Sequence, residues 1–572
     1  MDQPLGLKLA SLNLISQSKL ESILSQCGDK KDLIIDPALI KPLERICACV
    51  QKYKCVLDQI SSMLSQNSAL ADLKCFHIIV VPKVLSSYDS MLESRGLYEI
   101  VTLHTFSWDL MALDDQLLSL ELPFLFKQLF VEHNHSLLSS ISMSLWTLFH
   151  VTGKPKAIFS VGKLSASVLD ILQIYNETYA RDFISDNSSQ EIGALIVVDR
   201  NQDYPSSLLT PATYSGLLSE IFNINCGHLD LNVKETKIKK GKLKFGEEEK
   251  SETKSTVMTL DSSIDSLYGE IKHRHFSEVL SVLSSKAKLL KNEDIKALGM
   301  QEIKHFVANK LQHITLFKQN LVNHVLACET IISEMSNKFE NLKLSETEML
   351  NNRNKKSNFQ FVDEHFGTDV HIFNSLRLMC LLSLTQGLSY DEYNSLINKY
   401  LLAFGYKYLY VFNNLINAGL LVQPTSPKLS LNISNLGNLT VLCNALLASE
   451  TLAEVLTKLS ALTELKIGGK LIEKSRRGID TLNEKLSNLK LQNGELEFGC
   501  KDVKSFAKML KSDPKFGNTF PLKPKTVLVY VIGGVTYAEI AACDVVQTMT
   551  GSKIFIASDC IANGSDFMQA NT

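Results

Sequence analysis

The sequence lacks an excess of charge of either sign. Its 572 residues carry 59 basic and 61 acidic side chains, so the formal net charge is -2. This balance gives no global positive field of the kind that attracts nucleic acid or anionic lipid. Hydrophobic residues at 45% and charged residues at 21% are typical of a folded protein. The length predicts two to four domains and a sizeable core in each.

Long apolar runs are also missing. No stretch approaches the ~20 consecutive apolar residues that span a bilayer. The first residues, Met1-Asp2-Gln3-Pro4, lack the basic start and apolar core of a signal peptide. We therefore expect a soluble, cytoplasmic protein.

Paired cysteines are absent, although the chain has twelve cysteines. None forms the CxxC pairs of a structural zinc site. Cys47, Cys49 and Cys55 form the one cluster, in an apolar segment compatible with a helix, and their spacing differs from that of zinc sites. We expect reduced, mostly buried thiols and no metal site.

The sequence contains no GxSxG, HExxH, GxxxxGK[ST] or GxGxxG motif. Two glycine-containing pairs, Gly162-Lys163 and Gly533-Gly534, resemble phosphate loops only superficially, and we interpret them as packing features. The sequence thus predicts no catalytic residue and no cofactor. The alternative of an α/β enzyme stays open, because parallel-sheet domains with a cleft often bind small ligands.

The most informative stretch runs from Gly193 to Glu220. Ala194–Val198 is an uninterrupted apolar run, which predicts a strand buried on both faces of a parallel sheet. A polar loop over 201–210 follows. Thr210 and Pro211 then suit the N-cap and first position of a helix.

Other segments extend the α/β pattern. Residues 8–125 alternate between helix-like and strand-like segments, with helices predicted at Leu20–Gln26 and Leu39–Leu57 and a buried strand at Phe76–Val81. Strands are also predicted at 526–532 and 553–557. Residues 232–257 are charged and alternate in sign, which favours a solvated hairpin or loop over a lipid-binding patch.

From residue 260 onward the pattern becomes helical. Met300–Met335 carries an apolar stripe, and Ser375–Leu384 is apolar all round except for Arg377, which predicts a central buried helix. Gly387 suits the end of that helix. Two further helices are predicted at Tyr390–Ala403 and Leu409–Ala418. The fold class is therefore α/β plus all-α.

Several blocks, in order, resemble the signature of the SM proteins (the Sec-one/Munc-eighteen type). The residues that carry the resemblance around the central strand and near the last strands are Asp199, Arg200, Asp203, Thr213, Tyr214, Gly216, Glu220, Gly533, Gly534 and Glu539. Leu117–Leu122 and Leu267–Phe276 match further family blocks. Phe373–Leu421 and Asn225-Cys226-Gly227 resemble the vacuolar-sorting class C branch, leaning to its B-type members.

The resemblance implies an arch of two α/β parallel-sheet domains, with a large helical domain inserted into the second. We expect domain 1 over 1–125 and a discontinuous domain 2 over 126–245 and 505–572. The helical domain would span 246–504, with a hairpin at about 283–350 and a partner-docking subdomain at about 366–504. The chain departs from the family in two places. It has no proline between Phe306 and His324, and the family's usual strand and helix are not evident between Leu496 and Pro524.

The function implied is non-enzymatic. The protein would regulate SNARE-mediated tethering and fusion in endosomal and lysosomal (vacuolar) trafficking, associating peripherally with those membranes through partners. One partner would be an α-solenoid vacuolar-sorting subunit (VIPAR-like, or its HOPS counterpart), contacted by Tyr406 and Leu409. SNARE proteins would contact the hairpin near the outward-facing Leu316 and Phe317. No nucleic acid is expected as a partner. An alternative is a structural subunit that does not bind SNAREs.

Overall fold

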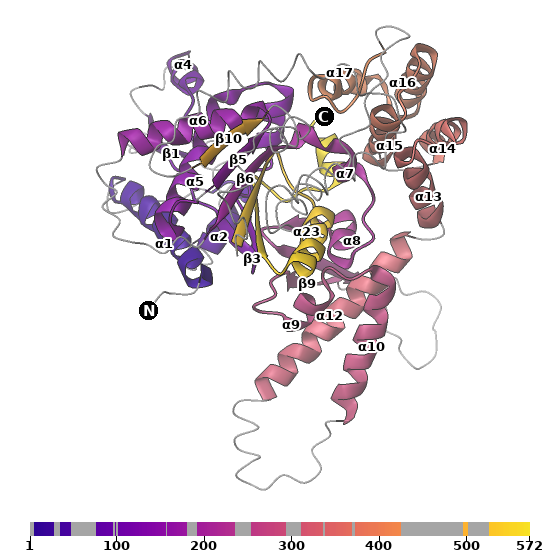
Figure 1. Cartoon of the computed structure of the whole chain (residues 1–572), viewed down its shortest axis with the longest axis horizontal. Helices are drawn as coiled ribbons and strands as arrows, with labels where there is room; N and C mark the ends of the chain where they lie inside the picture. The colour runs from indigo at the N-terminus through magenta and orange to yellow at the C-terminus, as the bar shows by residue number, and fades with distance from the viewer. Residues whose placement is uncertain are drawn as a thin grey trace, which may run out of the picture.

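The structure is a computed structural model that describes residues 5–27, 35–46, 76–94, 98, 101–155, 157–179, 192–234, 253–292, 311–335, 338–368, 372–424, 496–500 and 526–571. At its centre lies a seven-stranded sheet in the order β10-β5-β6-β11-β12-β4-β3 (Figure 1). All neighbouring strands run parallel except β3, which is antiparallel to β4. The strands are β3 (Met111–Asp114), β4 (Leu117–Ser119), β5 (Ala157–Val161), β6 (Ala194–Asp199), β10 (Leu496–Cys500), β11 (Thr526–Ile532) and β12 (Lys553–Ser558).

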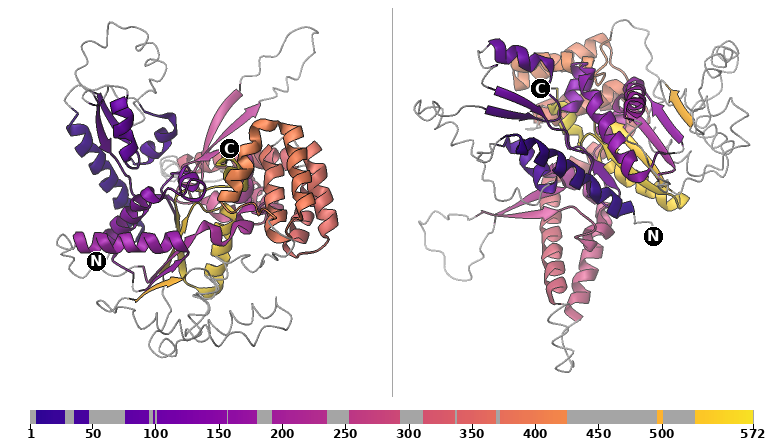
Figure 2. Two further views of the ribbon diagram at one scale, coloured as in Figure 1. Left: turned by 90° about the horizontal axis from the view of Figure 1, so that it is seen from above. Right: turned by 90° about the vertical axis from the view of Figure 1, so that its left-hand side faces the viewer.

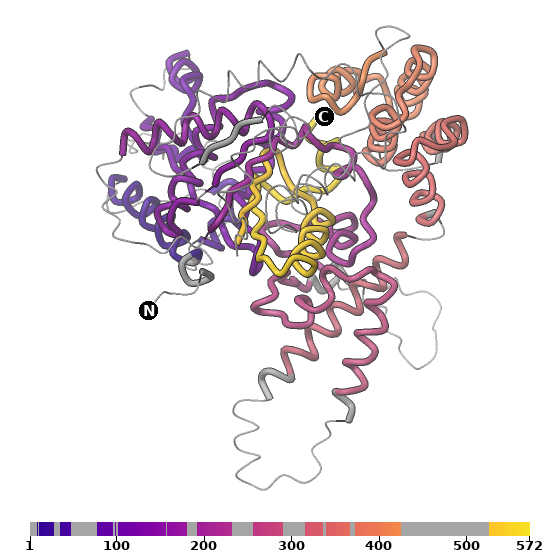
Figure 3. The backbone as a smooth tube through the Cα atoms, viewed as in Figure 1, coloured from indigo at the N-terminus to yellow at the C-terminus, as the bar shows by residue number. Residues whose placement is uncertain are grey.

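The predicted central strand is β6, and every residue in it is buried. It pairs with β5 on one side and with β11 on the other, so the C-terminal segment completes a sheet begun by the first half of the chain. The yellow C-terminal strands in Figure 3 run through the middle of the molecule. Continuous apolar runs suit these strands because both faces of the sheet are covered.

Side chains that alternate along the strands enter two separate cores. Leu195 and Val197 of β6 point into a core shared with α1 (Leu5–Ser25), α5 (Leu138–Thr152) and α6 (Lys163–Thr178). Ile196 and Val198 point into the opposite core, with α8 (Tyr214–Ile221), α9 (Ser266–Ile271) and α23 (Tyr537–Thr550). This period of two is the basic geometry of a strand.

The N-terminal part contains α1, α2 (Pro37–Ile46), α4 (Ser86–Ser94) and two parallel strands, β1 (Phe76–Val80) and β2 (Val101–Thr105). The predicted strand is present but is not buried as expected, since Ile78 is 44% exposed. The predicted helix Leu20–Gln26 is the end of the longer α1. For Leu39–Leu57 the structure gives α2, and residues 47–75 lie outside the described residues.

A small antiparallel sheet of β7 (Ile224–Asn225), β8 (His228–Lys234) and β9 (Thr253–Thr259) lies before the helical region. The charged stretch predicted as a hairpin or loop is bounded by β8 and β9, and residues 235–252 lie outside the described residues. The pairing of β8 with β9 therefore brings the two ends of that stretch together.

Helices α10 (Phe276–Asn292) and α12 (Leu311–Met335) lie side by side and project away from the body of the molecule (Figures 1 and 2). Their bases pack on the sheet through the same core as α8 and α9. Residues 293–310, which include Phe306 and Val307, lie outside the described residues. In the part of the chain that the structure describes, no helix has the length and hydropathy needed to cross a bilayer.

The second helical group lies on the opposite side of the body from α1 (Figure 1). Its members are α13 (Lys338–Leu350), α14 (Lys355–Thr368), α15 (Ile372–Thr385), α16 (Tyr390–Phe404), the short 3-10 helix η8 (Tyr406–Tyr408) and α17 (Leu409–Asn417). The predicted buried helix is α15, and all residues from Ser375 to Ser383 are buried. Gly387 follows it with a φ of 70°, in the left-handed region that glycine favours.

The sheet reaches beyond the expected bounds of domain 2. Strands β3 and β4 belong to it although they lie before residue 126, and β10 belongs to it although it lies before residue 505. The missing family strand between Leu496 and Pro524 is thus partly accounted for, because β10 forms the edge of the sheet beside β5.

Candidate functional site

The end of β6 places Asp199 at the N-terminus of α6. Its carboxylate accepts hydrogen bonds from the backbone N–H groups of Leu164 (2.8 Å) and Ser165 (2.7 Å). A Cβ at Gly162, whose φ is 126°, would lie 2.1 Å from Asp199 Oδ2. Burial raises the pKa of Asp199, although the N–H groups counteract it. The chain's own carboxylate thus occupies the position where a phosphate would bind at a helix N-terminus.

The Gly533-Gly534 turn is filled in the same way. Asp559 accepts hydrogen bonds from the Gly533 N–H (2.7 Å) and the Tyr530 hydroxyl (2.6 Å). A Cβ at Gly533, with a φ of 99°, would lie 2.5 Å from the ring of Phe130. Burial raises the pKa of Asp559 to about 6. The glycines therefore serve close packing.

Arg200 joins the end of β6 to the start of α23. Its guanidinium donates to both carboxylate oxygens of Glu539, at 2.9 and 2.7 Å, and it also donates to the backbone carbonyl of Asp203. Glu539 also forms the capping box of α23 with Thr536. Asp203 caps α7 (Tyr204–Leu208), and burial raises the pKa of Asp203 to about 6 despite the nearby Arg200. A bidentate pair of this kind fixes orientation as well as distance.

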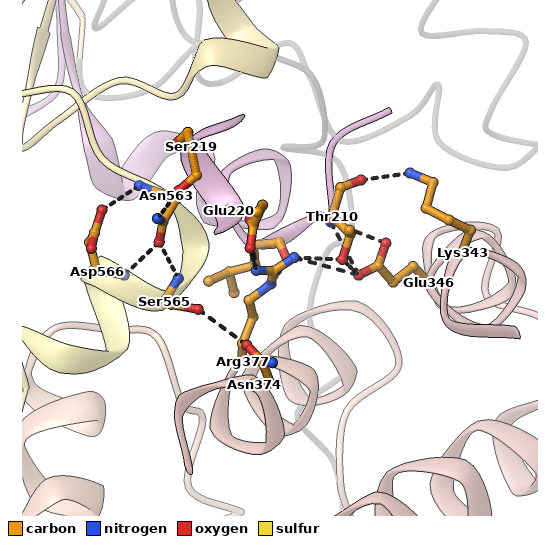
Figure 4. Close-up of polar contacts among 11 residues, drawn as sticks. Thr210, Ser219, Glu220, Lys343, Glu346, Asn374, Arg377, Asn563, Ser565 and Asp566 are labelled. Atoms are coloured by element: carbon orange, nitrogen blue, oxygen red, sulfur yellow. Dashed lines mark hydrogen bonds and ion pairs between the residues drawn. The ribbon is translucent and has the colours of Figure 1, made fainter. Parts of the chain in front are cut away.

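Arg377 holds the helical group against the sheet domain (Figure 4). It donates to both oxygens of Glu220 at 2.9 Å, to the carbonyl of Leu208 and to the hydroxyl of Thr210, both at 2.6 Å. Thr210 in turn donates to Glu346 of α13 at 2.6 Å. Burial alone would lower the pKa of Arg377, but the carboxylates of Glu220 and Glu346 raise it. The network therefore depends on a charged guanidinium.

A third buried group connects α8, α9 and the hairpin. The Tyr214 hydroxyl and His324 Nδ1 lie 2.8 Å apart, and His324 Nε2 lies 3.0 Å from Asp265 Oδ2. Asp265 also caps α9. Burial opposes ionisation of Asp265, but His324 and the α9 N–H groups hold its pKa below the ordinary value. Each ring nitrogen of His324 thus faces one neighbour, Nε2 toward Asp265 and Nδ1 toward Tyr214.

The remaining signature residues lie at the start of α8. Thr213 is the N-cap residue and forms an isolated bridge with His275. A Cβ at Gly216 would lie 2.4 Å from Cβ of Pro211, so only glycine fits there. Most of the signature residues thus contribute caps, close approaches or ion pairs to the second domain, and Tyr214 contributes the hydrogen bond to His324. Sequence analysis missed Arg377 and His324 as partners of Glu220 and Tyr214, although a single arginine in an apolar helix was a usable signal.

A recess of about 280 Å³ lies beside this network, lined in part by Glu121, Glu220, Cys226, Tyr537 and Asp566. Its lining residues include no histidine, lysine or arginine. Burial raises the pKa values of Glu121 and Asp566. The carboxylate of Glu220 in this recess is already paired with Arg377, which does not itself line the recess.

The predicted docking residues lie outside the network. Tyr406 is 70% exposed and Leu409 is 58% exposed, so neither belongs to the core. Leu316 on α12 is 45% exposed, as expected for an outward-facing residue. Phe317 was predicted to face outward, and that is wrong. It is half-buried and packs against the hairpin core, because it lies one turn before the buried Leu321.

A model of the Sec1 family matches residues 14–570. The chain belongs to the Sec1 family. Among relatives, the vacuolar protein sorting-associated protein 33B of Rattus norvegicus is 26% identical over 627 residues, covering 100% of this chain and 98% of the relative. The family predicted from the signature residues is therefore confirmed.

Solved structures show the same fold. The SM protein Vps45 in complex with the Qa SNARE Tlg2 aligns with a TM-score of 0.54 at 14% identity, covering 90% of this chain and 84% of that one. The Unc18–syntaxin 1 complex from Monosiga brevicollis aligns with a TM-score of 0.53 at 15% identity, covering 98% and 99%. The predicted SM-protein fold is confirmed for this Sec1-family chain.

Proposed function

We propose that this Sec1-family protein is a non-enzymatic regulator of SNARE-mediated tethering and fusion in endosomal and lysosomal (vacuolar) sorting. It would act in the cytoplasm, peripherally on endosomes and lysosomes, as a subunit docked to an α-solenoid sorting protein. The name of its 33B relative supports the sorting role, and two structural neighbours are complexes with SNARE proteins.

The observation that carries the docking proposal is an exposed apolar patch at the end of α16 and the start of α17. We call it the η8 patch, and it consists of Leu402, Tyr406, Leu409 and Tyr410, all more than half exposed. Two neighbouring aromatic residues, Tyr400 of α16 and Phe412 of α17, are better buried, since their rings pack on each other in the core. An apolar cluster of two tyrosines and two leucines has the composition of an interface centre.

The turn that presents the patch is well defined. Gly405 adopts a φ of 105°, and its backbone N–H caps α16 by donating to the carbonyl of Leu401. Tyr408 lies with its ring edge toward Tyr400, which ties η8 to the core. A preorganised turn loses little conformational entropy when a partner binds.

The non-enzymatic part of the proposal is supported by the carboxylates described above. Asp199 occupies the N-terminus of α6, and Asp559 fills the Gly533-Gly534 turn. A phosphate would have to displace a buried carboxylate at either place, at a large electrostatic cost.

The test of docking is Tyr406→Asp. Loss of a buried aromatic anchor typically costs ~2 kcal/mol or more, roughly 30-fold in affinity, and a charge adds a desolvation cost. We expect the variant to lose co-purification of the α-solenoid sorting subunit while keeping its far-UV circular dichroism. Tyr390→Asp is the matched control, because Tyr390 is equally exposed at the opposite end of α16.

Two outcomes would contradict the docking proposal. A folded Tyr406→Asp protein that still co-purifies the solenoid subunit would place the docking surface elsewhere. Equal losses from Tyr406→Asp and Tyr390→Asp would show a general charge effect. If the wild-type protein co-purifies the solenoid subunit but no SNARE proteins, the protein is a structural subunit.

A further inference from the structure

Two histidines and a cysteine from separate parts of the N-terminal region meet beside the two-stranded sheet. His77 lies on β1, His104 on β2, and Cys27 follows the end of α1. His77 Nδ1 and His104 Nε2 lie 2.9 Å apart, and the rings are 5.2 Å apart between centroids. The Cys27 thiol is reduced and donates to the carbonyl of Ile23 at 3.3 Å.

The strand register explains why the imidazoles meet. Ile79 is the partner of His104 in the parallel ladder, so His77 and His104 lie two residues apart on one face of the pair. The end of α1 then places Cys27 against the same face. The two ring nitrogens and the cysteine sulfur all lie within 4.8 Å of one another.

The separation of the two nitrogens is close to that in a zinc site, and the sulfur lies within 4.8 Å of them. With Zn–N of about 2.0–2.1 Å and Zn–S of about 2.3 Å, a tetrahedral ion holds its ligand atoms about 3.3–3.6 Å apart. The nitrogens would separate by about 0.4 Å from their present hydrogen-bond distance, which small side-chain rotations supply. Imidazole and thiolate are also the donor types that Zn²⁺ prefers.

We propose that Cys27, His77 and His104 bind a zinc ion that ties the end of α1 to both strands of the small sheet. His77 is exposed, which leaves the fourth coordination position open to water. Such a link would stabilise the region, because a two-stranded sheet is marginally stable and Ile78 of β1 is 44% exposed. The ion would supply cross-links that apolar packing does not.

The test uses the full-length protein, stripped with a chelator and titrated with Co²⁺ as a spectroscopic substitute for Zn²⁺. We expect one equivalent of Co²⁺ to give visible d–d bands and a thiolate-to-cobalt charge-transfer band, both abolished by Zn²⁺. Cys27→Ala removes the charge-transfer band. His77→Ala, a substitution at an exposed side chain, weakens Zn²⁺ binding by more than about 100-fold in chelator competition, since even indirect partners of metal ligands contribute 10–100-fold.

The matched control is His135→Ala, which removes another exposed histidine from the same chain. It should bind Co²⁺ and Zn²⁺ as the wild type does. Hydrogen exchange gives an independent measurement, and Zn²⁺ should slow exchange in β2 of the wild type but not of His77→Ala. Failure of the wild type to bind one equivalent, or an unchanged charge-transfer band in Cys27→Ala, would overturn the proposal.

Discussion

At the scale of single residues, Arg377 is the side chain on which most of the interdomain network depends. Arg377→Ala would leave Glu220 and Glu346 without their cation, and removal of one partner from a buried pair costs about 3–5 kcal/mol. We therefore expect the free energy of unfolding to fall by about that amount, measured by urea unfolding. Arg274→Ala is the control, because the Arg274–Glu278 pair is exposed and 3.9 Å apart. Similar effects of the two substitutions would contradict this account.

The burial of Asp559 predicts that the free energy of unfolding depends on pH. Its pKa in the folded state is about 6, above the ordinary value of 3.8, because burial disfavours the carboxylate. The folded state therefore binds its proton more tightly than the unfolded state. This contribution to stability is present at about pH 4 and is lost as the pH rises through about 6, and a shift of two units corresponds to about 3 kcal/mol.

Asp559→Asn should remove this contribution to the pH dependence of the free energy of unfolding. An amide can accept from the Gly533 N–H and donate to the Tyr530 oxygen, so both neighbours keep a partner. We expect the variant to gain stability over the wild type at neutral pH and to show no gain near pH 4. Urea unfolding at the two pH values measures this, and an equal change at both would exclude titration of Asp559 as the cause.

At the scale of elements, the hairpin presents two faces with different compositions. The inner face of α12 carries Leu321, His324 and Cys328, which are buried. Exposed apolar residues also lie on α12 at Val322, Val325 and Ile332, and we call these the outer face. We propose that this outer face engages a helix of a SNARE protein, because an amphipathic helix binds through such a stripe.

The double substitution Leu316→Asp with Val322→Asp tests the hairpin proposal. Both side chains are exposed, so we expect little change in unfolding, while binding to purified four-helix SNARE bundles or single SNARE chains falls about 30-fold or more. Phe317→Asp provides the contrast, since it should destabilise the hairpin by about 1–3 kcal/mol. Undiminished SNARE binding by the folded double variant would rule out this surface.

At the scale of the whole molecule, the sequence predicted what depends on local pattern. The apolar runs of β6 and β11 and the apolar helix α15 were evident because burial on all sides leaves a continuous signal. The exposure of β1 was not evident from the sequence, since a short apolar run looks the same whether or not helices cover the strand. Phe317 could have been placed correctly from its spacing of four to Leu321.

The contacts that build the network could not be predicted from the local sequence pattern. Arg377 meets Glu220, and Cys27 meets His77 and His104, only because the fold brings separate elements together. The lone arginine of α15 indicates a buried partner without identifying it, and two scattered histidines and a cysteine carry no periodicity that reveals their meeting. Family resemblance supplied the signature residues, and the structure supplied their contacts.

The order of the central sheet also has a consequence for protein synthesis. β6 emerges from the ribosome roughly 330 residues before β11, its partner in the sheet, which at 5–20 residues per second is a delay of about 20–70 s. During that time one edge of β6 has no neighbour, and its apolar residues lack their final cover. A ribosome that stops before residue 526 therefore releases a chain in which β6 has no β11 beside it.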